Sequence, residues 1–276
     1  MIPYFQLPAL HLGPLEIQSF GVFAALGVYV ASRLIGRAAR QRGLDGRPLT
    51  DFATWGVVAG VVCAHLVHLL LYHPEELRTG GPLQILKVWD GLSSMGGLLG
   101  GVLAAVVFFH RRGLRFSEYA DSFALGIAPG WAIARLGCFS VHDHPGVLTS
   151  FFFAVRFPDG PRHDLGLYDA LVLFALTLVL YRLARRRLLT GRLLAVLALG
   201  YGAARFALDF LRARDVAYAD ARYLGLTPAQ YASVLLVVYG VVELVRQRSG
   251  RSAMSNSSPE ANRGRQAQSA SDANPS

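Results

Sequence analysis

The hydrophobic positions of this chain fall into seven long apolar runs, which shorter and arginine-rich stretches separate. A helix needs about 20 residues to cross ~30 Å of hydrocarbon, and each run is close to that length. Backbone polar groups in lipid must be paired within their own segment, so the runs are predicted to be helices. The predicted spans are residues 18–35, 52–72, 91–109, 119–141, 165–183, 193–211 and 228–245.

The pattern as a whole predicts an all-α fold, a polytopic membrane protein of seven transmembrane helices. Residues 1–248 are expected to form a single transmembrane domain with an external loop at 142–164. The polar residues 249–276 have no apolar period, and we expect them to be a disordered cytoplasmic tail. Residues 1–16 contain neither a basic stretch nor a clear cleavage site, so the first span is expected to act as the targeting element.

Composition narrows the class of protein further. The 276 residues are 53% hydrophobic and only 16% charged, which excludes a disordered chain or an ordinary soluble protein. Two cysteines, Cys63 and Cys138, are too few for a disulfide framework. No zinc-ligand spacing is met, so we expect neither a metal nor another cofactor.

The distribution of basic residues predicts the orientation. The net charge is +9, and Lys87 is the only lysine. The first, third and fifth connections and the C-terminal tail hold 18 arginines, whereas the opposite side holds 7 basic residues. Because basic residues accumulate in cytoplasmic loops, the N-terminus is predicted outside and the C-terminus in the cytoplasm. Loop charge and contact with anionic membrane lipid account for the basic excess, so no nucleic-acid partner is expected.

Arg135 and Arg205 lie inside predicted spans, where an ionised side chain costs about 3 kcal/mol or more and usually faces a polar cavity. Two guanidinium groups at this depth indicate a buried site for an anion, most simply a phospholipid headgroup. Asp209 lies four residues after Arg205 on the same helix face. It has two alternative roles: a structural ion pair, or a group that orients Arg205 toward a ligand.

Other polar residues converge at the same predicted outer level. The predicted orientation places Arg135 and Arg205 in the outer halves of their spans, close to the external loop. This coincidence is the strongest indication of an active site. The residues that share the level are His142, Asp143, His144, His163, Asp164, Tyr168 and Asp169.

The run His142-Asp143-His144 allows three interpretations. A histidine can act as a general base near neutral pH. The two histidines can also be ligands of a metal, or the run can be a hydrogen-bonded structural loop with Asp143 orienting a histidine or pairing with an arginine. We favour the structural loop and the general base over the metal.

Small residues mark the start of the third span. Gly96/Gly100 and Gly97/Gly101 are small-xxx-small pairs, which favour close helix packing. We expect packing for Gly100 and Gly101. For Gly96 and Gly97, at the outer mouth, backbone N–H groups near a phosphate are an alternative.

Several of these segments resemble the prolipoprotein diacylglyceryl transferase family of bacterial membrane enzymes, in the family's motif order over about residues 17–245. The matching segments are Lys-Val-Trp-Asp-Gly (87–91) with Met-Gly-Gly-Leu-Leu-Gly (95–100), Ala-Arg-Leu-Gly-Cys-Phe (134–139) with Gly146, Arg-His-Asp-Leu-Gly-Leu-Tyr-Asp (162–169), and Gly-Tyr-Gly-Ala-Ala-Arg (200–205) with Asp209.

The resemblance implies a multi-pass enzyme of the bacterial plasma (inner) membrane that acts in lipoprotein biogenesis. Such an enzyme moves a diacylglyceryl group from phosphatidylglycerol to the lipobox cysteine thiol of a prolipoprotein signal peptide. The catalytic residues are then expected to be Arg135, Arg205, His142, His144 and Asp143. The substrate-binding residues are expected to be Gly96, Gly97, Gly146, His163, Tyr168 and Asp209.

The chain departs from the family pattern at three single positions and in the run His142-Asp143-His144-Pro145, which is not the usual Asn-Gly-containing sequence. The histidine that usually precedes the Gly-Gly pair is Met95, and the tyrosine near the outer end of the first helix is Phe20. Cys138 stands where many members have asparagine. The lost polar groups leave two further hypotheses open: a divergent paralogue that uses another acceptor, and a non-catalytic phospholipid-binding protein.

Overall fold

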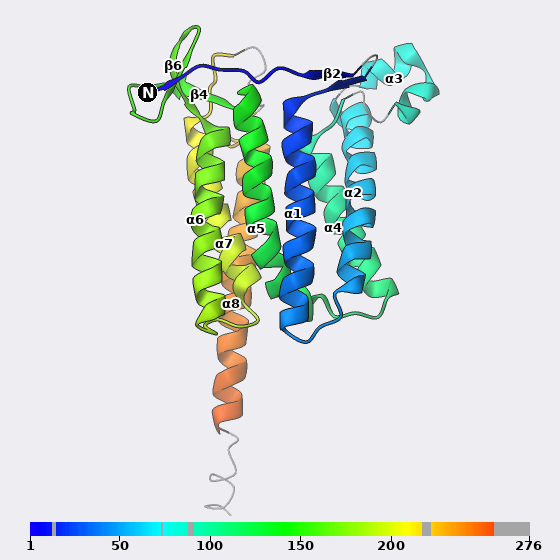
Figure 1. Cartoon of the computed structure of the whole chain (residues 1–276), viewed down its shortest axis with the longest axis vertical. Helices are drawn as coiled ribbons and strands as arrows, with labels where there is room; N and C mark the ends of the chain where they lie inside the picture. Colours follow the sequence, from blue (N-terminus) through cyan, green and yellow to red (C-terminus); the bar gives the residue numbers. More distant parts are fainter. Residues whose placement is uncertain (13–14, 73, 88–90, 217–221, 257–276) are drawn as a thin grey trace, which may run out of the picture.

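A bundle of long, nearly parallel helices forms most of the protein in the computed structural model (Figure 1). The structure describes residues 1–12, 15–72, 74–87, 91–216 and 222–256. The long helices are α1 (Ser19–Gln41), α2 (Arg47–Val67), α4 (Ser94–Arg111), α5 (Phe116–Val141), α6 (Leu165–Arg185), α7 (Leu193–Leu208) and α8 (Pro228–Asn256).

Six helices in the described part of the chain are long and apolar enough to cross a membrane. They are α1, α2, α5, α6, α7 and α8, so a mostly helical, multi-pass protein is confirmed. In the third predicted span, α4 runs from Ser94 to Arg111, and it includes the shorter apolar stretch Leu99–Arg111. α8 continues beyond residue 248 to Asn256, and the rest of the predicted tail lies outside the described residues.

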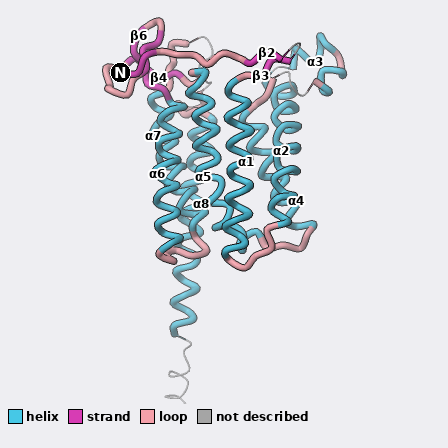
Figure 2. Tube along the Cα trace, viewed as in Figure 1, coloured by secondary structure: helices cyan, strands magenta, loops and turns pink. Residues whose placement is uncertain are grey.

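The fold is mostly helical, as predicted, but the segment 142–164, predicted to be a loop, contains strands. Figure 2 shows them capping one end of the bundle, hereafter the sheet end. The strands are too short for a period-2 pattern to be recognised, and β1 comes from the distant N-terminus. The sheet has the order β1-β5-β6-β4, built from β1 (Ile2–Pro3), β4 (Pro145–Leu148), β5 (Val155–Phe157) and β6 (Gly160–Asp164).

The remaining elements are short. They are the hairpin strands β2 (Leu10–Leu12) and β3 (Leu15–Ile17), a π-helical turn (His68–Tyr72), α3 (Pro74–Gly80), and two 3-10 turns, Pro82–Leu86 and Asp209–Leu211.

The opposite end of the bundle, hereafter the arginine end, contains the α1–α2, α4–α5 and α6–α7 turns (Figure 1). Asp121 is buried there, 1% exposed, near the start of α5. One of its oxygens accepts from Arg42 Nη2 at 2.7 Å and from the Gly191 N–H, and the other accepts from the Leu193 N–H at 2.9 Å. Asp121 therefore joins α1, α5 and the start of α7.

Helices α1 and α5 approach each other along a seam of small residues at the centre of the bundle. A Cβ atom added to Gly27 would lie 2.4 Å from the backbone oxygen of Gly130, and one added to Gly130 would lie 2.5 Å from the backbone oxygen of Gly27. Neither backbone oxygen can move without shifting its helix. The two glycines thus set the α1–α5 distance, and α5 carries Arg135.

We expect Gly27→Ala to lower the free energy of unfolding by about 1–3 kcal/mol, because the added methyl group overpacks the α1–α5 seam. Gly21→Ala is the matched control on the same helix, since no described atom lies within 4 Å of its added Cβ. That control is expected to be neutral or up to about 1 kcal/mol stabilising. Unfolding of both variants in mixed micelles checks this, and equal stabilities would contradict the close approach.

Candidate functional site

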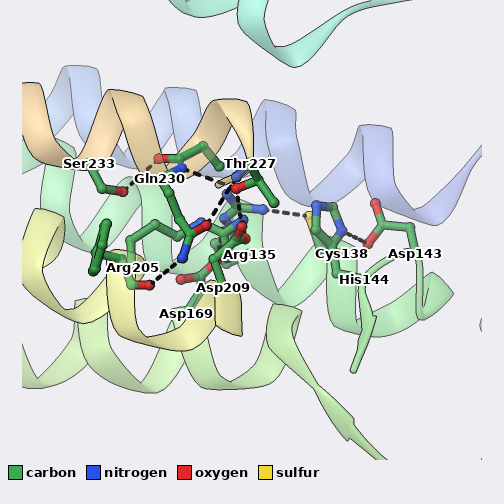
Figure 3. Close-up of polar contacts among 12 residues, drawn as sticks. Arg135, Cys138, Asp143, His144, Asp169, Arg205, Asp209, Thr227, Gln230 and Ser233 are labelled. Carbon is green, nitrogen blue, oxygen red and sulfur yellow. Dashed lines mark hydrogen bonds and ion pairs between the residues drawn. The ribbon is translucent and has the colours of Figure 1, made fainter. Parts of the chain in front are cut away.

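The site is built around one carboxylate between two arginines. Asp169, the fifth residue of α6, is fully buried, and its Oδ2 lies 3.4 Å from Arg135 Nε on α5 and 3.2 Å from Arg205 Nη1 on α7. Arg205 Nη2 lies 3.1 Å from Asp209 Oδ1, so the predicted i, i+4 ion pair is present. Figure 3 shows the four side chains converging between three helices. We call Arg135, Asp169, Arg205 and Asp209 the polar cluster.

The start of α8 completes the polar cluster. The Thr227 hydroxyl donates to Asp209 Oδ2, and both residues are fully buried. Thr227 and Gln230 also form a reciprocal capping box: the Thr227 N–H donates to Gln230 Oε1 at 3.0 Å, and the Gln230 N–H donates to Thr227 Oγ1 at 3.2 Å. Thr227 therefore caps α8 and also positions Asp209, the carboxylate that forms the ion pair with Arg205.

On its other side, Arg135 faces the sheet end. Its Nη1 donates to Cys138 Sγ at 3.6 Å, one turn further along α5. The ligand atoms of Cys138, Asp143 and His144 all lie within 4.8 Å of one another, and His144 Nδ1 contacts Asp143 Oδ1 (Figure 3). Three such groups resemble a metal site, but the guanidinium beside the sulfur opposes a cation. The trio instead extends the polar cluster toward solvent, since the Asp143 side chain is 40% exposed.

The structure separates the two predicted histidines. His142 is buried, with Nδ1 2.6 Å from Asp164 Oδ2 and its ring stacked on Tyr4. Phe5, Phe139 and Phe157 pack around the same ring. Its backbone is left-handed, at φ 52°, where it ends α5. This geometry favours a structural role for His142 and leaves His144 as the histidine beside Arg135 and Cys138.

Gly146 and the sheet fix the end of α7. A Cβ on Gly146 would lie 2.7 Å from the Leu211 backbone oxygen, just after Asp209. Arg162 donates to the Gly146 carbonyl at 3.1 Å and forms ion pairs with Asp159 and Asp215. Hydrogen bonds from Arg162 hold the pKa of both aspartates below the usual range. Gly146 thus contributes close packing, and the charges of the sheet are internally compensated.

Two predicted substrate-binding residues form a separate pair. His163 Nδ1 lies 2.9 Å from the Tyr168 hydroxyl, and Phe151 packs against both rings. Burial lowers the pKa of His163, which favours the neutral imidazole. Tyr168 directly precedes Asp169 in α6. Asp169 forms ion pairs with Arg135 and Arg205, so the two neighbouring residues have different partners.

The glycines of α4 lie outside the polar cluster. A Cβ on Gly96 would lie 2.5 Å from the Cys63 backbone oxygen of α2, and its N–H faces the Ser93 hydroxyl that caps α4. Gly100 packs against Ala59 in the same way, as predicted, whereas an added Cβ on Gly101 meets no described atom within 4 Å. Gly96 therefore serves α2–α4 packing, and Gly97 lies more loosely beside it.

The polar cluster can bind an anion through unused donors. A guanidinium carries five N–H groups, and Arg135 Nε and Arg205 Nη1 are buried without a hydrogen bond to the described residues, although both lie near Asp169. Fixed, desolvated donors stabilise charge that develops on a phosphate far better than mobile water does. The cluster is therefore suited to hold a phosphate group near the Cys138–His144 side.

Sequence reasoning did not include Asp169, Thr227 and Gln230 among the site residues. Two signals were available: an aspartate inside an apolar run, close to its start, and the pattern Thr-x-x-Gln directly before an apolar run.

We expect Asp169→Ala to lower the free energy of unfolding by about 3 kcal/mol, because it leaves two buried guanidinium groups without their shared partner. Asp143→Ala is the matched control: its partly exposed contact with His144 should contribute less than about 1 kcal/mol. Equilibrium unfolding of both variants measures the difference. A loss for Asp169→Ala no larger than that for Asp143→Ala would show that Asp169 does not hold the arginines.

Known proteins resemble this chain over most of its length. Residues 8–246 match the family model described as prolipoprotein diacylglyceryl transferase. Three relatives carry the name phosphatidylglycerol–prolipoprotein diacylglyceryl transferase. That of Nitratidesulfovibrio vulgaris strain Hildenborough is 33% identical, covering 84% of this chain and 91% of its own length. That of Neisseria meningitidis serogroup B is 30% identical (88% and 96%), and that of Burkholderia cenocepacia is 29% identical (92% and 98%). The chain belongs to the prolipoprotein diacylglyceryl transferase family.

Proposed function

We propose that this protein is an enzyme that transfers a diacylglyceryl group from phosphatidylglycerol to the lipobox cysteine thiol of prolipoproteins. The observation that carries the proposal is the pair of arginines, the half-buried Arg135 and the buried Arg205, held by Asp169 at one end of a membrane-spanning bundle. Family membership supports the same conclusion. A phosphate-binding cluster inside the bundle suits a substrate whose phosphate enters from lipid.

The proposed orientation places the sheet end outside and the arginine end in the cytoplasm of a bacterial plasma (inner) membrane. It rests on the arginines of the α1–α2, α4–α5 and α6–α7 turns, which lie at one end of the bundle. In this arrangement α4 also crosses the membrane, as the third of seven spans. The N-terminus is then outside, and the C-terminus is cytoplasmic. Phosphatidylglycerol and the prolipoprotein signal peptide then meet at the outer level.

The proposed reaction is a displacement at a glyceryl carbon. The thiol proton passes to a base, the thiolate sulfur attacks the carbon, and the carbon–oxygen bond to phosphate breaks as the thioether forms. The leaving glycerol phosphate keeps the electron pair, and Arg135 and Arg205 stabilise its charge. His144 is the proposed base, because it lies with Asp143 beside Cys138 and Arg135.

We propose more limited roles for the other predicted residues. Asp209 positions Arg205, and Gly146 lets the sheet approach the end of α7. His163 and Tyr168 shape the wall beside the cluster. Gly97, in the first turn of α4, is available for substrate contact, whereas Gly96 packs against α2.

Arg135→Ala is expected to slow diacylglyceryl transfer by at least about 100-fold, because it removes a fixed donor from the charge that develops on phosphate. Purified protein in phosphatidylglycerol vesicles with a lipobox peptide tests this, with the mass gain of the peptide measured by mass spectrometry. A Cys→Ser peptide is the substrate control, and Arg156→Ala, an exposed arginine of β5, is the matched variant. Full activity of a folded Arg135→Ala protein would overturn the proposed role.

The two histidines give a second, independent test. His144→Gln is expected to slow transfer by about 100-fold or more, since glutamine cannot accept the thiol proton. His142→Asn keeps a residue that tolerates left-handed backbone, so it should lower stability while turnover per folded molecule persists. The reverse result, with turnover lost only in His142→Asn, would reassign the base. Lipid binding without any turnover in the unmodified protein would instead favour a non-catalytic lipid pocket.

A further inference from the structure

A second candidate site lies at the arginine end of the bundle. A cavity of about 670 Å³ opens between α1, the start of α5, the end of α6 and the α6–α7 turn. Asp121 lines it, and Asp121 and Arg135 are 14 residues apart on α5, which is about 21 Å along a helix axis. The cavity is therefore separate from the polar cluster.

The cavity carries a strong uncompensated positive charge. Four arginines line it: Arg37, Arg42, Arg185 and Arg187. The only acid among the lining residues is Asp121, whose oxygens already accept from Arg42 and from two backbone N–H groups. Within the described residues, the other three arginines form no ion pair. Their charges remain available to a ligand.

The wall of the cavity is apolar beneath this charged rim. Leu34 and Ala38 of α1, Leu125 of α5 and Leu193 of α7 line it. An inorganic anion needs only the rim, whereas a phospholipid presents a phosphate next to a glyceryl group and acyl chains. Basic pockets between membrane helices on the cytoplasmic side are suited to lipid headgroups of this kind. Charged rim and apolar wall together match an amphipathic phosphate ester.

One rim arginine occupies an unusual backbone position. Arg187 has φ 52°, in the left-handed region that is uncommon for residues other than glycine, asparagine and aspartate. Glycine would fit this turn with less strain. The position can therefore be changed to glycine without harming the fold, which provides a sharp variant for testing.

We propose that this cavity binds the phosphate group of an anionic phospholipid at the membrane surface opposite the polar cluster. The inference does not depend on the proposed transferase activity. The alternative is that these arginines act only as a topology signal. Any arginines at this end would then contribute equally to the binding of anionic lipid.

The test compares two triple variants of the purified full-length protein in neutral detergent. The cavity variant is Arg37→Gln/Arg185→Gln/Arg187→Gln. The matched control is Arg33→Gln/Arg111→Gln/Arg115→Gln, three exposed arginines at the same end that do not line the cavity. The probe is phosphatidic acid, read as the rise in thermal unfolding midpoint, since a ligand of the folded state raises that midpoint. Both variants keep the polar cluster, so their difference reports on the cavity alone.

We expect the cavity variant to lose more than half of the midpoint rise and the control variant to keep it. Equal rises in both variants, or equal losses, would overturn the proposal. Phosphatidylcholine is the zwitterionic control lipid. If it raises the unfolding midpoint as much as phosphatidic acid does, the proposal is also overturned. Inorganic phosphate at the same concentration distinguishes the source: a matching, cavity-dependent rise would assign the site to free phosphate.

Arg187→Gly keeps the proposal testable if the triple variant fails to fold. Because glycine relieves the left-handed backbone, the midpoint without lipid should stay the same or rise. The lipid-dependent rise should still shrink. A full lipid-dependent rise in this variant would remove Arg187 from the site and contradict the proposed rim.

Discussion

A charged side chain inside an apolar bundle is stable only where the protein supplies the partners that water would otherwise provide. In this chain the partner is Asp169, which meets guanidinium groups from α5 and α7 at once. The convergence of three helices at one carboxylate defines their relative rotation, because each charged group must face the same point. Asp209 and Thr227 then bring in α8, so the bundle and the polar cluster depend on the same contacts.

The two ends of α5 illustrate how a carboxylate can serve different purposes in one fold. At the arginine end, Asp121 accepts backbone N–H groups and one arginine, which leaves it fully satisfied. At the sheet end, both oxygens of Asp169 lack conventional hydrogen bonds within the described structure, although two arginines lie close. A saturated carboxylate is typical of a structural joint. Around Asp169, Arg135 Nε and Arg205 Nη1 also form no hydrogen bond within the described structure, so these donors are available to an anionic ligand.

Hydropathy predicted the helical segments well because lipid allows few alternatives to a helix, and each predicted span is helical over most of its length. The strands at 145–164 were missed because they are short, and because β5 pairs with the distant residues Ile2 and Pro3. The Arg205–Asp209 pair was predictable from i, i+4 spacing. The Arg135–Asp169 contact was not, because nothing in one sequence gives the rotation of α5 against α6. Likewise, the short spacing of His142 and His144 in the sequence did not indicate that their side chains lie in different surroundings. The left-handed backbone of His142 at the end of α5 separates them.

The capping box at Thr227 has a consequence for how the chain is made. Helices of a membrane protein enter the bilayer in the order of their synthesis, so α7, with Arg205 and Asp209, is made before the residues that satisfy Asp209. Among the described residues, the acidic partner of Arg205 on an earlier helix is Asp169, which is already present before residues 227–230 leave the ribosome. A chain that ends after α7 therefore lacks the Thr227 hydroxyl, which donates to Asp209 in the complete protein. Completion of the last helix and maturation of the polar cluster are the same event.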